Sequence, residues 1–191
     1  MIETHEYDLC KTNPKYFIEN YCYIRTVGGI SKIQLTPTQD HILFGFLNKP
    51  SHTKNQDYHY LVRQCGKTTI LQCIALWSVI FTDQNNALVC TREAHARDVK
   101  YNVADMATRL PLWMASSVHT TKDSVSINNK LLKIVSPSAT FQERFDTLFL
   151  DEMKWYHAGV NRLRTVATFK NSLSLSSQTK DIKVITTHGQ Q

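Results

Sequence analysis

The chain has 191 residues, of which 42% are hydrophobic and 20% charged, a length and balance typical of one globular domain with a sizeable core. No apolar stretch approaches the roughly 20 residues of a transmembrane helix, and the acidic, polar N-terminus is unlike a signal peptide. The five cysteines include no C-x-x-C pair, which argues against a zinc site or a disulfide framework and favours a reducing cytosol.

The positive charge is concentrated near the C-terminus. Residues 154–191 hold six basic side chains and one acidic side chain, a local excess of five within a net charge of +6. Such an excess suits a polyanionic partner such as DNA, and it is equally typical of a solvated basic face. Within this segment the candidates for contact with duplex DNA are Arg162, Arg164 and Lys170.

The first 57 residues predict short elements joined by polar loops. Pro14 fits the first turn of a helix over 14–21. KIQL predicts a strand at 32–35, and Thr36 can cap a helix over 36–48 that has Pro37 in its first turn. Residues 49–57 are polar and predict a loop.

From residue 58 onward, strands alternate with helices. Apolar periodicity predicts helices over 67–81 and 92–110 and a hairpin around Asn128-Asn129. Short apolar runs predict strands at 58–62, 87–91, 147–152 and 181–187. This alternation predicts an α/β fold with a mainly parallel sheet and helices on both of its faces.

A phosphate-binding loop is expected where the strand at 58–62 meets the helix at 67–81. VRQCGKTT, residues 62–69, contains Gly-Lys-Thr, although Leu61 stands where the G-x-x-x-x-G-K-[ST] pattern has its first glycine. In such loops backbone N–H groups at a helix N-terminus surround phosphates, the lysine reaches them, and the hydroxyl binds magnesium. The residues expected to bind nucleotide are Arg63, Gln64, Cys65, Gly66, Lys67, Thr68 and Thr69.

A second part of the site is expected at the end of the strand over 147–152. LFLDE places Asp151 and Glu152 after three apolar residues, at the end of the strand where open α/β sheets bind ligands. Asp151 would hold Mg²⁺ through a water molecule, with Thr68 as a further ligand, and Glu152 would orient and deprotonate the attacking water. Alone, such a pair is more often a strand that ends at the surface, so this assignment depends on the loop at 61–69.

Together these motifs resemble the N-terminal ATPase domain of the large terminase subunit of tailed bacteriophages, closest to the myovirus type. The deviant loop VRQCGKTT is the most specific match, and LFLDE matches the acidic pair of the family. NYCYIRT at 20–26 is similar to the segment before the first core strand. LTPTQDHIL at 35–43 is similar to the adenine-recognising segment, and VITTHG at 184–189 lies where the family has its coupling motif. The resemblance covers nearly the whole chain.

The resemblance implies one P-loop ATPase domain of RecA/ASCE-like fold over 1–191, with an adenine-side segment at 1–35, a core at 58–191, and ATP and Mg²⁺ as cofactors. It implies catalytic roles for Glu152, Lys67 and Arg63, the last as an arginine finger acting in cis; a surface ion pair is the alternative for Arg63. Gln39 would recognise adenine, although glutamine is also common in the first turn of a helix. The coupling and sensor residues would be Thr186, Thr187, His188 and Gly189.

The chain departs from the family at three places. The family often has Arg-Gly upstream of the acidic strand, whereas this chain has FQERFD at 141–146, so that role is not assigned to Arg144. The coupling motif usually has a proline or further small residues before its glycine, where this chain has His188. Family members continue into an RNase H-like nuclease domain, whereas this sequence ends at Gln191, so no nuclease activity is expected from it. An excised domain, a gene fragment and one half of a split protein all stay open.

The function implied is an ATP-hydrolysing motor that drives double-stranded DNA into a procapsid in the host cytoplasm. The implied partners are duplex DNA, a portal protein, a small terminase subunit and further copies in a homo-oligomeric ring on the capsid; the isolated chain would be a monomer, and no membrane is involved. Two alternatives stay open: a helicase-like or repair ATPase that depends on nucleic acid, and a fragment of a packaging subunit that binds nucleotide without turnover.

Overall fold

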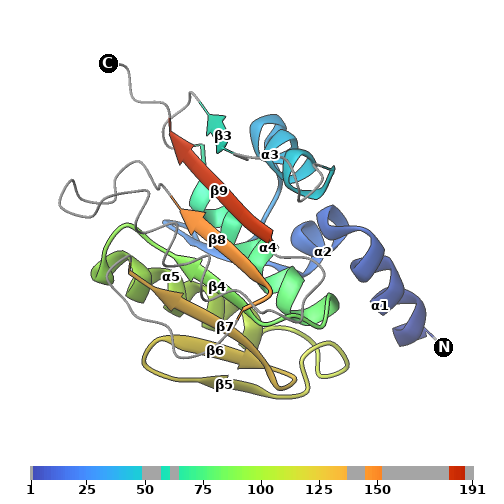
Figure 1. Ribbon diagram of the computed structural model, residues 1–191. Helices are drawn as coiled ribbons and strands as arrows, with labels where there is room; N and C mark the ends of the chain where they lie inside the picture. Colours follow the sequence, from blue (N-terminus) through green and yellow to red (C-terminus); the bar gives the residue numbers. More distant parts are fainter. Residues whose placement is uncertain (1, 49–56, 61–64, 137–144, 152–180, 188–191) are drawn as a thin grey trace.

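A seven-stranded sheet organises the computed structural model, which describes residues 2–48, 57–60, 65–136, 145–151 and 181–187 (Figure 1). From one edge to the other the strands are β3 (Asp57–Tyr60), β9 (Asp181–Thr187), β8 (Thr147–Asp151), β4 (Asn86–Val89), β7 (Lys130–Val135), β6 (Ser124–Ile127) and β5 (Val118–Thr120). Neighbouring strands from β3 to β7 are parallel, and β6 and β5 extend the sheet in antiparallel fashion. The predicted mainly parallel α/β sheet is confirmed.

The order of the strands identifies the type of α/β fold. β9 lies between β3, which precedes the predicted phosphate loop, and β8, which ends in Asp151. In the register, Tyr60 of β3 pairs with Thr187, and Asp151 pairs with Ile185. An additional strand between these two is the arrangement of the RecA/ASCE-like P-loop fold, and the predicted fold class is therefore confirmed.

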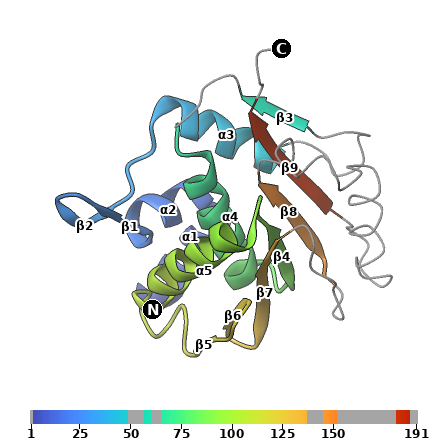
Figure 2. The same cartoon turned by 90° about the vertical axis from the view of Figure 1, so that its left-hand side faces the viewer.

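Two helices cover one face of this sheet. α4 (Lys67–Phe81) is buried along nearly its whole length, because it is apolar almost all round. α5 (Glu93–Thr108) buries the stripe formed by Val99, Val103 and Met106, as its periodicity predicts. α4 contacts β4, β7 and β8, and α5 contacts β5, β6 and β7, so both lie on the same side of the sheet (Figure 2).

The opposite face of the sheet is also buried. Ala87 and Leu148 alternate along their strands with Leu88 and Phe149, which belong to the core beneath α4 and α5, and all four are almost fully buried. A parallel sheet buried on both faces is the expected arrangement. Within the described ranges no helix packs on this second face, so helices on both faces stay a prediction for that side.

The N-terminal part consists of α1 (Ile2–Thr12), α2 (Pro14–Tyr21) and α3 (Pro37–Asn48), with the hairpin β1 (Tyr23–Thr26) and β2 (Gly29–Lys32) between α2 and α3. α2 begins as predicted: Asn13 caps it, accepting a hydrogen bond from Tyr16 N at 3.1 Å. The strand predicted at 32–35 is wrong. The second strand of the hairpin ends at Lys32, and Leu35 N donates instead to Glu19 Oε1 at 3.3 Å.

α1 is an element that sequence patterning missed. It is mostly polar, and it is held by contacts with residues distant in sequence. Trp77 Nε1 on α4 donates to Cys10 O at 2.9 Å, and Glu6 Oε1 accepts from Tyr16 and Tyr21 hydroxyls at 2.8 Å each. No helix among the described residues has both the length and the apolar character that crossing a bilayer requires.

Candidate nucleotide site

The candidate site lies at the carboxyl ends of the parallel strands, where α4 begins and β8 ends. Thr68 in the first turn of α4 donates from Oγ1 to Asp151 Oδ2 at 2.9 Å, across 83 positions of sequence. The Asp151 side chain is fully buried, because β8 is an inner strand and Asp151 is its last residue. The structure thus brings together the two residues that the sequence predicts as magnesium ligands.

Gly66 shapes the start of α4. It has φ 77° and ψ 24°, in the left-handed region that glycine adopts at little cost. A Cβ atom at this position would lie 2.2 Å from Gln39 Nε2, so the loop is also closely packed against α3. Its carbonyl accepts from Ile70 N at 3.1 Å and begins the hydrogen-bonding of the helix. The remaining N–H groups of this first turn are those that would face an anion.

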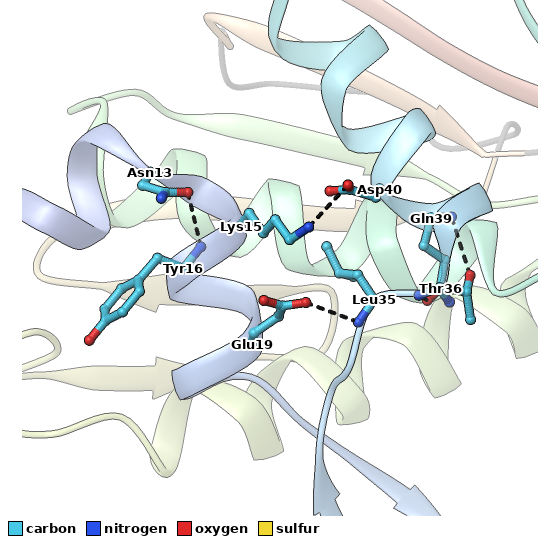
Figure 3. A network of polar contacts seen from close by, with 8 residues as sticks. All are labelled: Asn13, Lys15, Tyr16, Glu19, Leu35, Thr36, Gln39 and Asp40. Carbon is cyan, nitrogen blue, oxygen red and sulfur yellow. Dashed lines mark hydrogen bonds and ion pairs between the residues drawn. The ribbon is translucent and has the colours of Figure 1, made fainter.

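Gln39 contacts Thr36 through a hydrogen bond of its carboxamide oxygen. Oε1 accepts from Thr36 N at 3.0 Å, while Thr36 Oγ1 accepts from Gln39 N at 3.3 Å, which is the reciprocal pattern of a capping box (Figure 3). Nε2 points to Gly66. Gln39 therefore lies between the start of α3 and the predicted phosphate-binding loop. The capping box is indicated by T-P-T-Q at 36–39, where Gln follows Thr after three positions, and the sequence analysis missed it. Recognition of adenine by Gln39 stays a prediction.

α2 contacts the start of α3 and the segment that precedes it. Lys15 Nζ forms an ion pair with Asp40 Oδ2 at 3.0 Å, and Glu19 bonds the segment that leads into α3, as Figure 3 shows. Both contacts fix where α3 begins, and hence where Gln39 meets Gly66. An exposed ion pair such as Lys15–Asp40 adds little stability, so its main effect here is on position.

Lys67 occupies a position that suits an anionic ligand. Its side chain is only 5% exposed and lies in the first turn of α4, which contains no acidic residue. Its Nζ is 4.0 Å from Cys65 Sγ. The positive end of the helix dipole and the lysine side chain would together favour a bound phosphate at the start of α4.

Thr69 lies on a different side of α4. It lines a small pocket with Tyr23, Gln72 and Asp105, between α4, α5 and β1. Asp105 in this pocket is paired with Arg109 and Arg25, and its hydrogen bond to Arg109 is the main cause that lowers its pKa. Thr69 is therefore not brought next to Asp151 in the way that Thr68 is.

His95 is a neighbour of Asp151 that the sequence interpretation missed. Its Nε2 lies 3.8 Å from Asp151 Oδ2, and its Nδ1 lies 3.2 Å from Thr91 Oγ1. β4 and β8 are parallel, with Val89 opposite Leu150, so the turn after β4 passes beside the end of β8. Burial and the charge of Asp151 both raise the pKa of the Cys90 thiol, which fits this closeness. The sequence gives no signal for this contact, because it depends on the pairing of β4 with β8.

Several predicted residues lie outside the described ranges: Arg63, Gln64, Glu152, Arg162, Arg164, Lys170, His188 and Gly189. The backbone of the predicted coupling residues Thr186 and Thr187 is described, and these residues end β9 beside β3. Because β9 also pairs with β8 in parallel, the carboxyl end of β9 lies on the same side of the sheet as Asp151 and the start of α4.

Solved structures of phage large terminases share this fold. The large terminase of bacteriophage HK97 superposes with a TM-score of 0.71 at 16% identity, over 92% of this chain and 37% of that protein. The ATPase domain of the large terminase of Thermus phage P74-26, as the R139A mutant, has a TM-score of 0.53 at 15% identity, over 83% of this chain and 71% of that one. Neither protein-family profiles nor curated proteins gave a match to the sequence. At these identities the similarity establishes the fold, the one the sequence motifs predict.

Proposed function

We propose that this chain is the ATP-hydrolysing domain of a viral DNA-packaging motor of the large terminase type. The observation that carries the proposal is the hydrogen bond between Thr68 and the buried Asp151, within a fold similar to two terminase structures. A threonine after Gly-Lys and an aspartate at the end of an inner strand are the two protein groups that a P-loop ATPase uses at its metal. Because the chain spans 37% of the HK97 terminase, the packaging activity itself is part of this proposal.

The donor set fits magnesium. A hydroxyl oxygen and a carboxylate oxygen are hard ligands of the kind Mg²⁺ prefers, and magnesium usually takes few protein ligands and completes its shell with water and phosphate oxygens. Thr68 and Asp151 would hold the ion, the latter through a water molecule. When bound, the ion would neutralise charge on the phosphates of ATP.

The other residues would act on the nucleotide and on water. Lys67 and the N–H groups after Gly66 would bind the β- and γ-phosphates, using the positive end of α4. Glu152, the residue after Asp151, would orient the attacking water and accept its proton. Arg63 would offset the charge that develops on the transferring phosphoryl group. The γ-phosphate would be sensed by Thr186 and Thr187, with His188 and Gly189. Its release would then change the position of a DNA-gripping element.

The partners follow from the same proposal. Duplex DNA would contact the basic segment that holds Arg162, Arg164 and Lys170. A portal protein, a small terminase subunit and further copies in a ring would complete the motor in the host cytoplasm. The isolated chain would be a monomer.

Magnesium-dependent ATP hydrolysis by the purified chain tests the proposal, with Lys67→Ala and Glu152→Gln beside it and the exposed Lys11→Ala as matched control. We expect turnover that falls at least about a hundredfold in both site variants, an unchanged rate in the control, and stimulation by linear duplex DNA. Unwinding of a forked duplex would favour a helicase-like ATPase instead. ATP binding that Lys67→Ala abolishes, without turnover, would favour a non-hydrolysing packaging fragment. Absence of ATP binding would contradict the proposal.

A further inference from the structure

Side chains from two elements other than β8 lie close to the same oxygen atom of Asp151. Oδ2 accepts a hydrogen bond from Thr68 on α4 at 2.9 Å, and the same atom lies 3.8 Å from His95 Nε2 on α5. Asp151 is fully buried, whereas the His95 side chain is 26% exposed. The imidazole is therefore partly exposed to solvent, whereas the carboxylate that it approaches is not.

The backbone sets the place of His95. α5 follows β4 after a short turn, with Arg92 in extended conformation at its N-cap, and His95 is in the first turn of this 16-residue helix. β4 pairs with β8 along its whole length, so this first turn cannot move far from the end of β8 without breaking the sheet. His95 thus approaches Asp151 from a rigid element, as a group that fixes a side chain must.

Thr91 determines how the imidazole can act. Its Oγ1 lies 3.2 Å from His95 Nδ1. If the hydroxyl donates to Nδ1, the proton of a neutral imidazole is on Nε2, which faces the carboxylate. The distance of 3.8 Å is longer than that of a typical direct hydrogen bond, about 2.7–3.2 Å. A shift of roughly 0.6 Å, or one bridging water, would complete the chain from Thr91 through His95 to Asp151.

We propose that His95, oriented by Thr91, is a positioning residue that holds the Asp151 carboxylate in the orientation that binds magnesium with nucleotide. The proposal rests on the ATPase function proposed above. Partners of this kind fix the orientation of a metal-binding carboxylate, and their loss typically weakens metal binding about 10- to 100-fold. The competing explanation is that His95 only caps the start of α5 with Thr91, which would affect stability and leave magnesium binding unchanged.

The test is binding of a fluorescent ATP analogue to the purified chain, titrated with Mg²⁺ and repeated in EDTA. We expect His95→Ala to raise the half-saturating magnesium concentration about tenfold, with affinity in EDTA and the melting temperature changed little. His95→Gln keeps an N–H donor near the place of Nε2 and should restore most of the loss. His119→Ala, an exposed histidine on β5, should match the wild type.

Each outcome bears on the proposal. An unchanged magnesium titration for His95→Ala would overturn it while leaving the ATPase function intact. Equal impairment of His95→Gln and His95→Ala would assign the effect to packing and overturn it as well. If His95→Ala does not fold, Thr91→Val replaces it, and the same direction of shift is expected in magnesium dependence. A wild-type chain that binds no nucleotide with magnesium would overturn both proposals.

Discussion

Different interactions stabilise two regions of the molecule: the carboxyl ends of the strands, where the proposed nucleotide site lies, and the N-terminal helices. At the carboxyl ends, short-range features of the backbone place the polar groups: a left-handed glycine, the start of α4, and the end of an inner strand. The N-terminal helices are attached through contacts of individual side chains, such as Trp77 with Cys10 and Tyr21 with Glu6. The first region is expected to control ligand binding, and the second to control stability.

Replacement of Gly66 should change both stability and ligand binding, and it tests this separation from the side of the site. Gly66→Ala should destabilise the chain by about 1–3 kcal/mol, because alanine is strained at φ 77° and its Cβ would meet Gln39. It should also weaken nucleotide binding at least about tenfold, since the N–H groups after it would be displaced. Thermal melting and nucleotide titration measure the two effects.

Gly28→Ala is the matched control for this replacement. A Cβ there would approach only Thr26 Oγ1, at 3.8 Å, so the change should stay within about 0.5 kcal/mol with unchanged nucleotide binding. Wild-type nucleotide affinity in Gly66→Ala would mean that the left-handed loop is not part of the binding site.

Replacement of Glu6 should have a smaller effect, on stability alone. It tests the separation from the side of the N-terminal helices. The hydrogen bonds from Tyr21 and then Tyr16 hold the pKa of Glu6 below its ordinary value of 4.5. A lowered pKa in the folded state means that this stabilisation is present above about pH 4.5 and is lost as the pH falls through the lower folded pKa. Glu6→Gln should therefore lower the melting temperature at pH 7, and the difference from wild type should shrink toward pH 3.

The same variant should bind ATP as the wild type does, because α1 contributes no group to the site among the described residues. Glu3→Gln, an exposed acid in the first turn of α1, controls for the change in charge. A difference between Glu6→Gln and wild type that stays constant with pH would contradict the role of the tyrosine hydrogen bonds. Altered ATP affinity would contradict the separation of the two regions.

Features with a local cause could be predicted from the sequence. α4 begins and ends at the predicted residues, because Gly66 supplies the left-handed start and the run to Phe81 is apolar. Asn128 and Asn129 both have positive φ, as the predicted hairpin between β6 and β7 requires. The meeting of Thr68 with Asp151 follows from a general rule, that the carboxyl ends of parallel strands share one edge.

Features that depend on tertiary contacts could not be predicted from the sequence. α1 has few apolar residues, and packing of Tyr7 against Phe81 belongs to the folded chain alone. The strand predicted at 32–35 was displaced because the hairpin turn between Thr26 and Gly29 sets its register. His95 carries no motif of its own. Its nearness to Asp151 results from the pairing of β4 with β8, which no local pattern specifies.

ATP turnover by Asp151→Asn tests the central claim most directly. Asparagine keeps the size of the side chain and can still accept from Thr68, so the fold should persist while the charge needed at the metal is lost. We predict magnesium-dependent hydrolysis in the wild type and a loss of at least about a hundredfold in the variant, with a cooperative melting transition in both. Equal turnover in the two proteins would contradict the assignment of Asp151 and, with it, the proposed ATP site.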